Sequence, residues 1–383
     1  MSVGERWTLV RLAALALAFR VLSAGLAFLE NVVFPLYQRE QFTMFGRTSP
    51  FWDPFTRYDS GWFFGIAHNG YAYVAGGRSN LAYFPVYPML MRHVGRLFGR
   101  TPADLYLGGI AVSWTAFVAA MVVLYLLARL DLPQERAERA VLLTAVFPFA
   151  FFFGVVYTES VFLLFAVTAF YGFRTRRWML GGIAGALATA TRVNGVFILP
   201  ALAWIAWQSA KSERRDRAFA VGALALAASG VAAYSLFVYS LSGNPFEWAA
   251  SIERWGYYPG GSPLSAPFRL IASLLGHPYA FLAGERMAPY DALNGVTALV
   301  FLATVPFVWL RLGAGYGLFM LANLWLPLSS GQYEGLGRYC SVLFPCFIWV
   351  AGSRSRVSDA ALVVSAMGYT LCQALFTTIH PLF

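Results

Sequence analysis

The residues best suited to chemistry lie in one aromatic stretch, residues 51–90, which contains Asp53, Arg57, Asp59 and His68 among tryptophans, tyrosines and small residues. This stretch lacks the long apolar run that crosses a bilayer. A carboxylate beside arginines and aromatic rings suits the transfer of a sugar from a lipid phosphate. The acid would deprotonate an acceptor hydroxyl, and the arginines would stabilise the departing phosphate by charge-assisted hydrogen bonds.

Elsewhere, charged residues are rare, since only 12% of the chain is charged and 59% is hydrophobic. Single ionisable residues therefore stand out in apolar or aromatic surroundings, and such residues are candidates for functional sites. Outside the first stretch, those that we expect on the same side of the membrane are Glu159, Arg192, Glu253, Arg254, Glu334 and Arg338.

The elements that must position these residues are membrane helices, because the mean hydropathy is +0.60 and apolar runs recur along the chain. We expect one integral membrane domain, residues 1–383, with about eleven transmembrane helices. Seven expected spans are Leu9–Leu29, Leu105–Ala128, Ala218–Ser240, Ala292–Leu310, Leu312–Leu328, Tyr339–Gly352 and Ala360–Thr378.

Two longer apolar segments are each expected to form a hairpin of two short spans. Residues 140–173 contain one charge, Glu159, and residues 178–210 contain one, Arg192. Arginines flank both segments, so both ends of each should lie on the cytoplasmic side, where basic residues concentrate. The tips, at residues 157–160 and 191–195, should then face outward.

The net charge of +10 comes mostly from arginines in short loops, because Lys211 is the one lysine among 28 basic residues. This distribution indicates membrane topology and gives no reason to expect a nucleic-acid partner. It places the N-terminus in the cytoplasm. Residues 30–104 then form a large first extracytoplasmic loop with interfacial helices, including one at residues 87–98, and residues 241–291 form a second.

Arg20 lies within the first expected span, where a charge is costly. It either pairs with a carbonyl or snorkels, or it serves a function such as binding phosphate. The three cysteines fall in apolar spans and are expected to be packing residues without a disulfide. The four histidines lack the spacing of a zinc site, and no phosphate-binding glycine loop is present.

Several motifs resemble those of the PIG-V-like mannosyltransferases. The first is Arg57-Tyr-Asp59-Ser-Gly-Trp62 through Gly70-Tyr71, followed by Ala82-Tyr-Phe84-Pro85-Val-Tyr87-Pro88. The others, in chain order, are Phe147-Pro148, Tyr157-Thr-Glu159-Ser160, Ala188-Thr-Ala-Thr-Arg192-Val-Asn194-Gly195, Gly337-Arg338-Tyr339 and Phe344-Pro345. The segment 241–291 carries no motif of this kind.

The resemblance implies a GT-C glycosyltransferase that moves mannose from a polyprenyl phosphate to a hydroxyl on the extracytoplasmic face, with inversion. It makes Asp59 the general base, in a motif where Tyr58 replaces a common tryptophan. It implies donor-phosphate binding by Arg57, Arg192 and Arg338. Residues that would bind or orient substrate are Glu159, Trp62, His68, Asn194 and Tyr339.

Structural roles compete with these assignments. Asp59 could cap a helix that starts near Ser60, since aspartate is favoured there, and Asp53 could start a turn before Pro54. Glu159 could pair with Arg192 as a buried strut. Arg338 could anchor to lipid headgroups, and His68 could serve as an interfacial hydrogen-bonding residue.

Asp53 and Asp59 are spaced too widely for a tight metal clamp, so we expect turnover without a metal. Two other function classes remain open. A transporter or flippase of lipid-linked sugars would show internal repeats and interrupted helices, and a scaffold would present lipid to a partner. The acceptor is undetermined. The arginine-rich, lysine-poor composition favours a prokaryotic plasma membrane.

Overall fold

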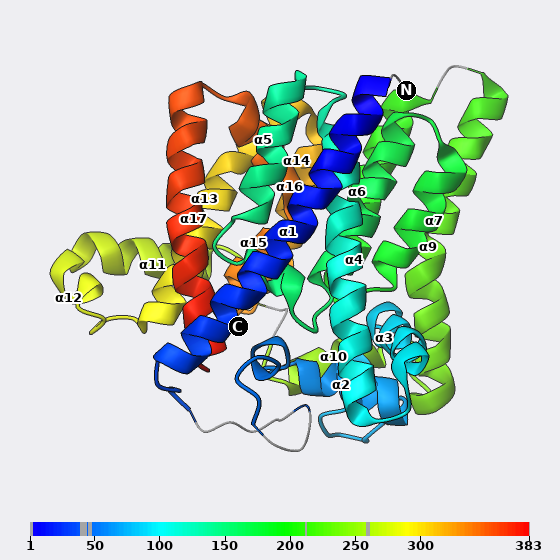
Figure 1. The fold of residues 1–383 in the computed structure, drawn as a ribbon. Coiled ribbons are helices and arrows are strands. Elements are labelled where there is room, and N and C mark those ends of the chain that lie inside the picture. Colours follow the sequence, from blue (N-terminus) through cyan, green and yellow to red (C-terminus); the bar gives the residue numbers. More distant parts are fainter. Residues whose placement is uncertain (1–2, 39–43, 45–47, 211–212, 258–260, 383) are drawn as a thin grey trace.

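The computed structural model describes residues 3–38, 44, 48–210, 213–257 and 261–382, and this part of the chain forms helices and no strands. Lys211 lies outside it. Five helices are long and apolar enough to cross a membrane (Figure 1). They are α1 (Val3–Val33), α4 (Pro102–Ala128), α9 (Arg214–Ser242), α13 (Pro289–Leu312) and α17 (Ser355–Thr377).

Shorter helices complete the bundle. They are α5 (Gln134–Ala145), α6 (Glu159–Arg174), α7 (Trp178–Thr189), α8 (Ile198–Ser209), α14 (Ala314–Ser329) and α16 (Phe344–Gly352). The chain reverses between α5 and α6 and again between α7 and α8, at the two expected hairpins. Arms of 12 and 16 residues extend roughly 18–24 Å, less than the ~30 Å hydrocarbon core. The count of eleven spans stays a prediction.

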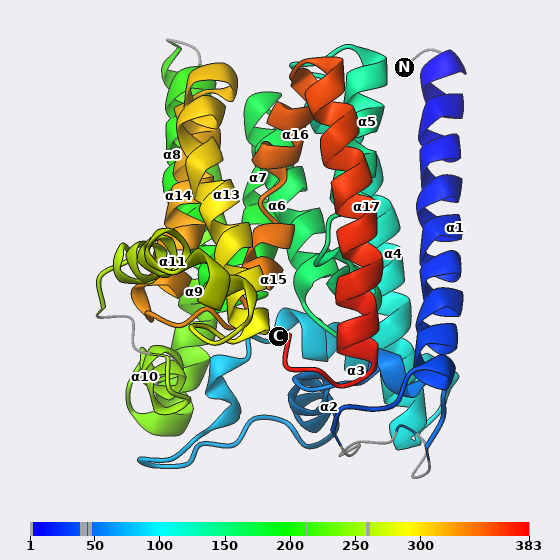
Figure 2. The ribbon, with the colours of Figure 1, turned by 90° about the vertical axis from the view of Figure 1, so that its left-hand side faces the viewer.

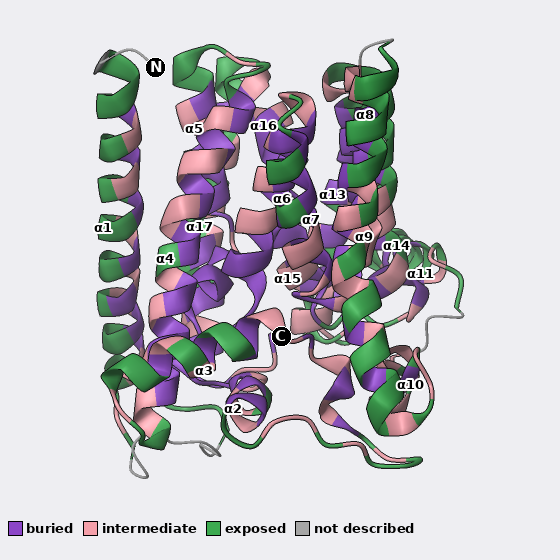
Figure 3. Ribbon diagram, turned by 90° about the vertical axis from the view of Figure 1, so that its right-hand side faces the viewer, coloured by how far each residue is buried: buried purple, intermediate pink, exposed green. Residues whose placement is uncertain are grey.

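The burial pattern is that of a bundle in lipid. Buried residues concentrate at the centre, whereas α1 and α9 expose much of their length (Figure 3). In the apolar windows of α1 and α9 only 28% and 22% of residues are buried, against 56% in α4. The exposed side chains of α1 include Val10, Leu15, Leu22 and Leu29. Because such apolar surface needs a lipid environment, the chain is an integral membrane protein.

The two ends of the bundle differ. The N-terminal end of α1, the adjoining ends of α8 and α9, and the loops joining α4 to α5 and α16 to α17 lie at one end (Figure 2). At the other end lie α2 (Ser60–Asn69), α3 (Val86–Phe98) and α10 (Glu247–Arg254). The arginine-rich loops and the aromatic stretch are therefore at opposite ends, and the helix expected at residues 87–98 is confirmed as α3.

The second long connecting segment, between α9 and α13, contains α10, α11 (Ser265–Gly276) and α12 (Pro278–Leu282). Helices α11 and α12 project sideways from the bundle (Figure 1). Helix α10 instead packs back against the first connecting segment and reaches the short 3-10 turn at Asn80–Ala82. The two long segments thus meet over one end of the bundle.

A non-helical stretch, residues 146–158, lies buried in the bundle and includes the 3-10 turn Ala150–Gly154. Outside an α-helix, not all of its backbone carbonyls can be bound by backbone N–H groups, and side chains supply further hydrogen bonds. Four side chains donate hydrogen bonds to these carbonyl oxygens: Arg20 to that of Ala150 (3.2 Å), Ser160 to Phe153 (2.7 Å), Trp114 to Gly154 (3.0 Å) and Ser113 to Val155 (2.8 Å). This stretch carries the chain to Glu159 at a fixed position.

Arg20 takes the carbonyl-pairing role and not the phosphate-binding one. It is 1% exposed and donates to Ala150 and to the hydroxyl of Tyr369 at 3.2 Å each. Its guanidinium also lies 4.3 Å from the ring centre of Phe117. These contacts replace water around a charge that would otherwise be costly at this depth.

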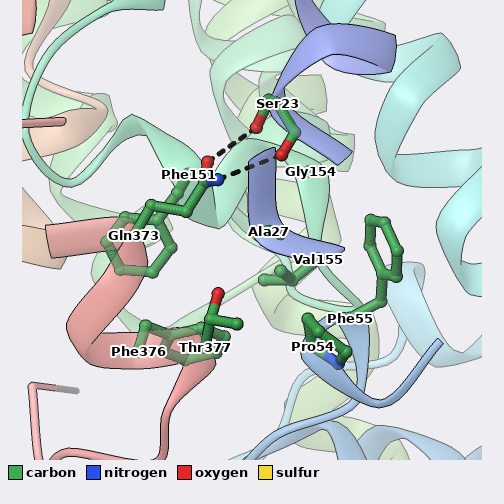
Figure 4. A pocket seen from close by; sticks show the side chains of 10 residues that line it. All are labelled: Ser23, Ala27, Pro54, Phe55, Phe151, Gly154, Val155, Gln373, Phe376 and Thr377. Atoms are coloured by element: carbon green, nitrogen blue, oxygen red, sulfur yellow. Dashed lines mark hydrogen bonds between the residues drawn. The ribbon is translucent and has the colours of Figure 1, made fainter. Parts of the chain in front are cut away.

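A small pocket lies between α1, α17 and the buried stretch (Figure 4). Ser23 and Gln373 hydrogen-bond across it in both directions, at 2.7 and 3.0 Å. Its other lining is mostly apolar and includes Phe376, whose ring contacts that of Tyr157 at 6.1 Å between centroids. The pocket belongs to the α1–α17 seam, and the ionisable residues of the candidate site do not line it.

Close packing of α7 on α9 gives a stability prediction. A Cβ at Gly230 would lie 1.9 Å from the backbone oxygen of Ala186, whereas one at Gly222, on the same helix, would meet nothing within 4 Å. Gly230→Ala should destabilise the protein by about 1–3 kcal/mol, and Gly222→Ala should stabilise it by about 0.5–1 kcal/mol through helix propensity. Thermal unfolding of the two variants in detergent checks the prediction. Equal unfolding midpoints for Gly230→Ala and Gly222→Ala would contradict the close packing of α7 on α9.

Candidate active site

Asp59 is held at the start of α2 by a strained backbone. The preceding residue, Tyr58, has φ of 53°, a left-handed conformation that is unusual for a bulky residue. The Tyr58 hydroxyl donates to the carbonyl of His380 at 2.7 Å, and the Asp59 backbone N–H donates to the hydroxyl of Tyr157 at 3.1 Å. Both contacts hold the turn that aims the Asp59 side chain.

The Asp59 carboxylate does not cap α2, so that alternative is wrong. Asp59 occupies the N-cap position, but its side chain makes no capping hydrogen bond. Instead, Oδ1 accepts from the hydroxyl of Tyr83 at 3.1 Å, and Oδ2 accepts from Nη1 of Arg338 at 2.7 Å. With its side chain 25% exposed, the carboxylate is held in place and remains accessible.

Arg338 lies on the short helix α15 (Leu336–Ser341) and joins two carboxylates. Its Nε donates to Oε1 of Glu159 while Nη1 donates to Asp59. Its guanidinium also lies 4.4 Å from the ring centre of Tyr157. The neighbouring Gly337 lets α15 approach closely, because a Cβ there would lie 2.2 Å from the ring of Phe149.

Glu159 is fully buried at the first position of α6 and has a second arginine partner. Nη1 of Arg192 donates to its Oε1 at 3.0 Å, so both arginines bind the same oxygen. The expected Glu159–Arg192 pair is confirmed as a buried contact. The other oxygen, Oε2, has no hydrogen-bond partner among the described residues, an unusual situation for a buried carboxylate.

The four residues Asp59, Glu159, Arg192 and Arg338, here called the charged cluster, are electrically balanced. Burial lowers the pKa of Arg338, but Glu159 and Asp59 outweigh burial and raise it well above its ordinary value. Burial also raises the pKa of Tyr83, and the adjacent Asp59 raises it further. Arg338 therefore stays cationic and Tyr83 stays a hydrogen-bond donor at neutral pH.

Aromatic rings surround the carboxylate of Asp59. Trp62, which is 39% exposed, stacks on Tyr83 with ring centroids 5.8 Å apart. Trp255, from the second connecting segment, packs edge-on against Trp62 at 4.7 Å and against Tyr83 at 6.2 Å. Sequence reasoning missed Trp255 because segment 241–291 carries no recognised motif. It also assigned no role to Tyr83 and Tyr157, although both lie inside motifs that it quoted.

Two other expected substrate residues lie close to the charged cluster or to its supports. The ring of Tyr339 packs under Arg192, with the guanidinium 5.0 Å from the ring centre. Asn194 is buried, and its amide donates to Asn323 at 2.9 Å. Tyr339 can therefore orient Arg192, whereas Asn194 links the turn at 193–197 to α14.

The structure places Arg57 and His68 away from the charged cluster. Arg57 is 4% exposed and donates to Asn31 and to the carbonyl of Thr377, both at 3.1 Å. Burial lowers its pKa to about 10. His68 is exposed, bonds to Asn69 and stacks on the ring of Phe64. Arg57 thus ties the strained turn to α1 and α17, and we leave both residues out of the proposed site.

Asp53 is also separate from the charged cluster. It is 1% exposed, begins the 3-10 turn Asp53–Phe55, and accepts from the backbone N–H of Ser49 at 2.6 Å. This is the expected turn-starting role. Within the described residues, no group of three or more histidine, cysteine or acidic side chains could hold a metal ion. Metal independence remains a prediction for a chelator assay.

The geometry combines an accessible carboxylate with two arginines and exposed rings. A carboxylate of this kind can take a proton from a hydroxyl. Arginines beside it can bind the oxygens of a phosphate. The three cysteines, by contrast, are free and buried, as expected of packing residues.

The fold resembles that of a solved glycosyltransferase. The oligosaccharyltransferase of Archaeoglobus fulgidus in its apo form matches with a TM-score of 0.51 over 96% of this chain and 56% of that chain, at 14% identity. The likeness confirms the expected all-α GT-C fold.

Sequence comparison points to a family. Two curated proteins of Cryptococcus neoformans var. neoformans serotype D, both named GPI mannosyltransferase 2, are 33% identical over 152 residues. The alignment covers 38% of this chain and 35% of each relative, so it spans about a third of their length. The family model described as Mannosyltransferase (PIG-V) matches residues 15–239. The chain therefore belongs to the mannosyltransferase (PIG-V) family.

Proposed function

We propose that this protein transfers a mannosyl residue from a polyprenyl-phosphate donor to a hydroxyl acceptor, with inversion, on the extracytoplasmic face. The observation that carries the proposal is the Arg338 guanidinium, which joins the accessible Asp59 to the buried Glu159. A base and a phosphate-binding cation are thus neighbours. Membership of a mannosyltransferase family supports mannose as the sugar.

In the proposed reaction, Asp59 accepts the proton of the acceptor hydroxyl. The acceptor oxygen forms a bond to C1 of the sugar while the C1–O bond to phosphate breaks on the opposite face. The bonding electrons go to the phosphate, whose growing negative charge is stabilised by Arg338 and Arg192. Glu159 holds both arginines in position.

The location of the charged cluster supports the extracytoplasmic face. The aromatic stretch that contains Asp59 lies at the end of the bundle opposite the N-terminus and opposite several arginine-rich loops (Figure 2). Positive loops favour the cytoplasm, so the opposite end faces outward. A lipid-linked donor could approach from the bilayer that surrounds the exposed apolar helices.

A flippase for lipid-linked sugars is the second function considered. Such proteins place polar residues along a path near the bilayer midplane. Here four charged residues of the motifs, Asp59, Glu159, Arg192 and Arg338, form one cluster where the connecting segments meet the bundle. This arrangement favours a transferase.

We predict that Asp59→Asn abolishes transfer without unfolding the protein. The amide keeps the shape of the side chain but cannot accept a proton, so the rate should fall by about 10²- to 10⁴-fold. The assay measures transfer of labelled mannose from polyprenyl phosphate in proteoliposomes, beside a thermal unfolding scan. Asp53→Asn is the matched control and should keep its specific activity. Full activity in the Asp59 variant would refute the mechanism.

We also predict that Arg338→Lys lowers transfer by roughly 10²-fold. A lysine keeps the charge but lacks the fork that reaches Glu159 and Asp59 together. The same assay, with Arg139→Lys as a control for a half-buried arginine that is paired with Asp359 and lies outside the charged cluster, measures the effect. An unchanged rate and donor KM in the Arg338 variant would show that neither the bridge nor phosphate binding requires this guanidinium.

A further inference from the structure

The short helix that carries Arg338 has no cap from its own sequence. Helix α15 spans Leu336–Ser341, and the residue at its N-cap position, Gly335, has no side chain that could bind the first backbone N–H groups. The start of this helix is buried, including Gly337. Because a buried backbone N–H without a partner is costly, another part of the chain has to supply the acceptor.

Asn294, in the second turn of α13, supplies that acceptor. Its side-chain oxygen Oδ1 accepts from the backbone N–H of Gly337 at 2.8 Å, although 43 positions separate the two residues. Asn294 is 1% exposed, and a buried asparagine in a membrane helix is stable when its amide is bonded across to another element. Since Gly337 directly precedes Arg338, this bond fixes the backbone from which the Arg338 guanidinium reaches its two carboxylates.

The amide nitrogen of the same side chain faces the C-terminal segment, here residues 378–382, which follows α17. Nδ2 of Asn294 donates to the carbonyl of Tyr290 in its own helix at 3.1 Å and makes a longer contact of 3.5 Å to the carbonyl of Leu382. The Leu382 side chain is fully buried and belongs to the main hydrophobic core. A single side chain thus contacts both α15 and the C-terminal segment.

The C-terminal segment also holds the backbone next to Asp59. The carbonyl of His380 accepts from the hydroxyl of Tyr58 at 2.7 Å. The imidazole of His380 stacks on the ring of Tyr37, with centroids 4.5 Å apart. Ile379 has φ of 63°, a conformation that a β-branched residue keeps only where its surroundings enforce it. The segment is therefore a fixed support for the turn that precedes Asp59.

We propose that Asn294 is a positioning residue and that, together with the C-terminal segment, it sets the position of Arg338 relative to Asp59. Asn294 acts on Arg338 through the cap of α15, and the segment acts on Asp59 through Tyr58. Asn294 is buried with both amide atoms engaged, so it acts through these contacts and not on a substrate. The inference rests on the proposed function for the roles of Asp59 and Arg338.

Steady-state kinetics of Asn294→Leu and Tyr58→Phe test the proposal. Each substitution keeps most of the side-chain volume and removes the hydrogen bonds described above. Because small displacements of reacting groups slow the chemical step, we expect each variant to lower kcat about tenfold while the donor KM changes less than about threefold. The assay measures mannose transfer in proteoliposomes, per amount of folded protein. Asn294→Ala replaces the leucine variant if that one does not fold.

Two matched controls remove buried polar contacts elsewhere. Thr304→Val, also in α13, deletes a buried hydroxyl that donates to the carbonyl of Phe301. Tyr316→Phe deletes a buried hydroxyl that accepts from Arg174 at 2.9 Å. Both variants should keep the wild-type kcat. Equal losses of kcat in the controls and in Asn294→Leu would overturn the positioning role, because the effect would then follow from the loss of any buried polar contact.

The double variant Asn294→Leu/Tyr58→Phe tests whether the two contacts form one unit. If both set the same relative position, the double variant should lose about tenfold in kcat, as each single variant does. Independent effects would multiply to about a hundredfold. A hundredfold loss would therefore overturn the joint action of Asn294 and the C-terminal segment, and an unchanged kcat in Asn294→Leu would overturn its positioning role.

Hydrogen exchange, measured by mass spectrometry on the full chain in nanodiscs, reads the cap without any substrate. Asn294→Leu should speed exchange in the peptide that contains Gly337 by about tenfold or more, with α4 unchanged. Unchanged exchange there would overturn the cap. A wild-type protein that does not transfer mannose would refute the proposed function, whereas transfer by wild type and by Asn294→Leu at equal kcat would refute this inference alone.

Discussion

The bridge from Arg338 to Glu159 and Asp59 is the interaction on which the site depends. Glu159 is fully buried, and a buried carboxylate is stable only when it is paired. Its two partners, Arg192 and Arg338, come from different hairpin and loop segments, so this pairing draws three distant parts of the chain together. Arg338 then extends the same network to Asp59, which gives the accessible acid a fixed position.

The surroundings of this bridge are rigid for identifiable reasons. The buried stretch at 146–158 leads into Glu159, and side chains of neighbouring helices bind three of its carbonyls. On the other side, the left-handed turn at Tyr58 is held by hydrogen bonds to His380 and Tyr157. A strained turn of this kind persists only where its surroundings over-determine it. Such pre-organisation lets a base and cations act without rearrangement.

Much of the site was predictable from the sequence, by residue type together with the family motifs. Asp59, Glu159, Arg192 and Arg338 are isolated ionisable residues in apolar or aromatic surroundings, and the structure brings all four together. Arg57 is also an ionisable residue in such surroundings, yet its side chain bonds to Asn31 and Thr377. The left-handed turn at Tyr58 lies between the two residues, so the Arg57 and Asp59 side chains point in different directions. Trp255 could not be found, since its role comes from a contact between two long segments and not from a local pattern.

The sequence by itself determined that the chain is a helical membrane protein, where its apolar segments lie and roughly where the two hairpins turn. The reason is that insertion into a bilayer depends on local hydropathy and on the placement of nearby arginines. The family motifs also gave the expected fold. Only the tertiary structure decided that Arg338, and not Arg57, joins Asp59 to Glu159, and which rings adjoin the base. Those outcomes depend on the direction of each side chain and on contacts such as Arg338–Asp59 and Trp62–Trp255, between residues more than a hundred positions apart, which no local pattern encodes.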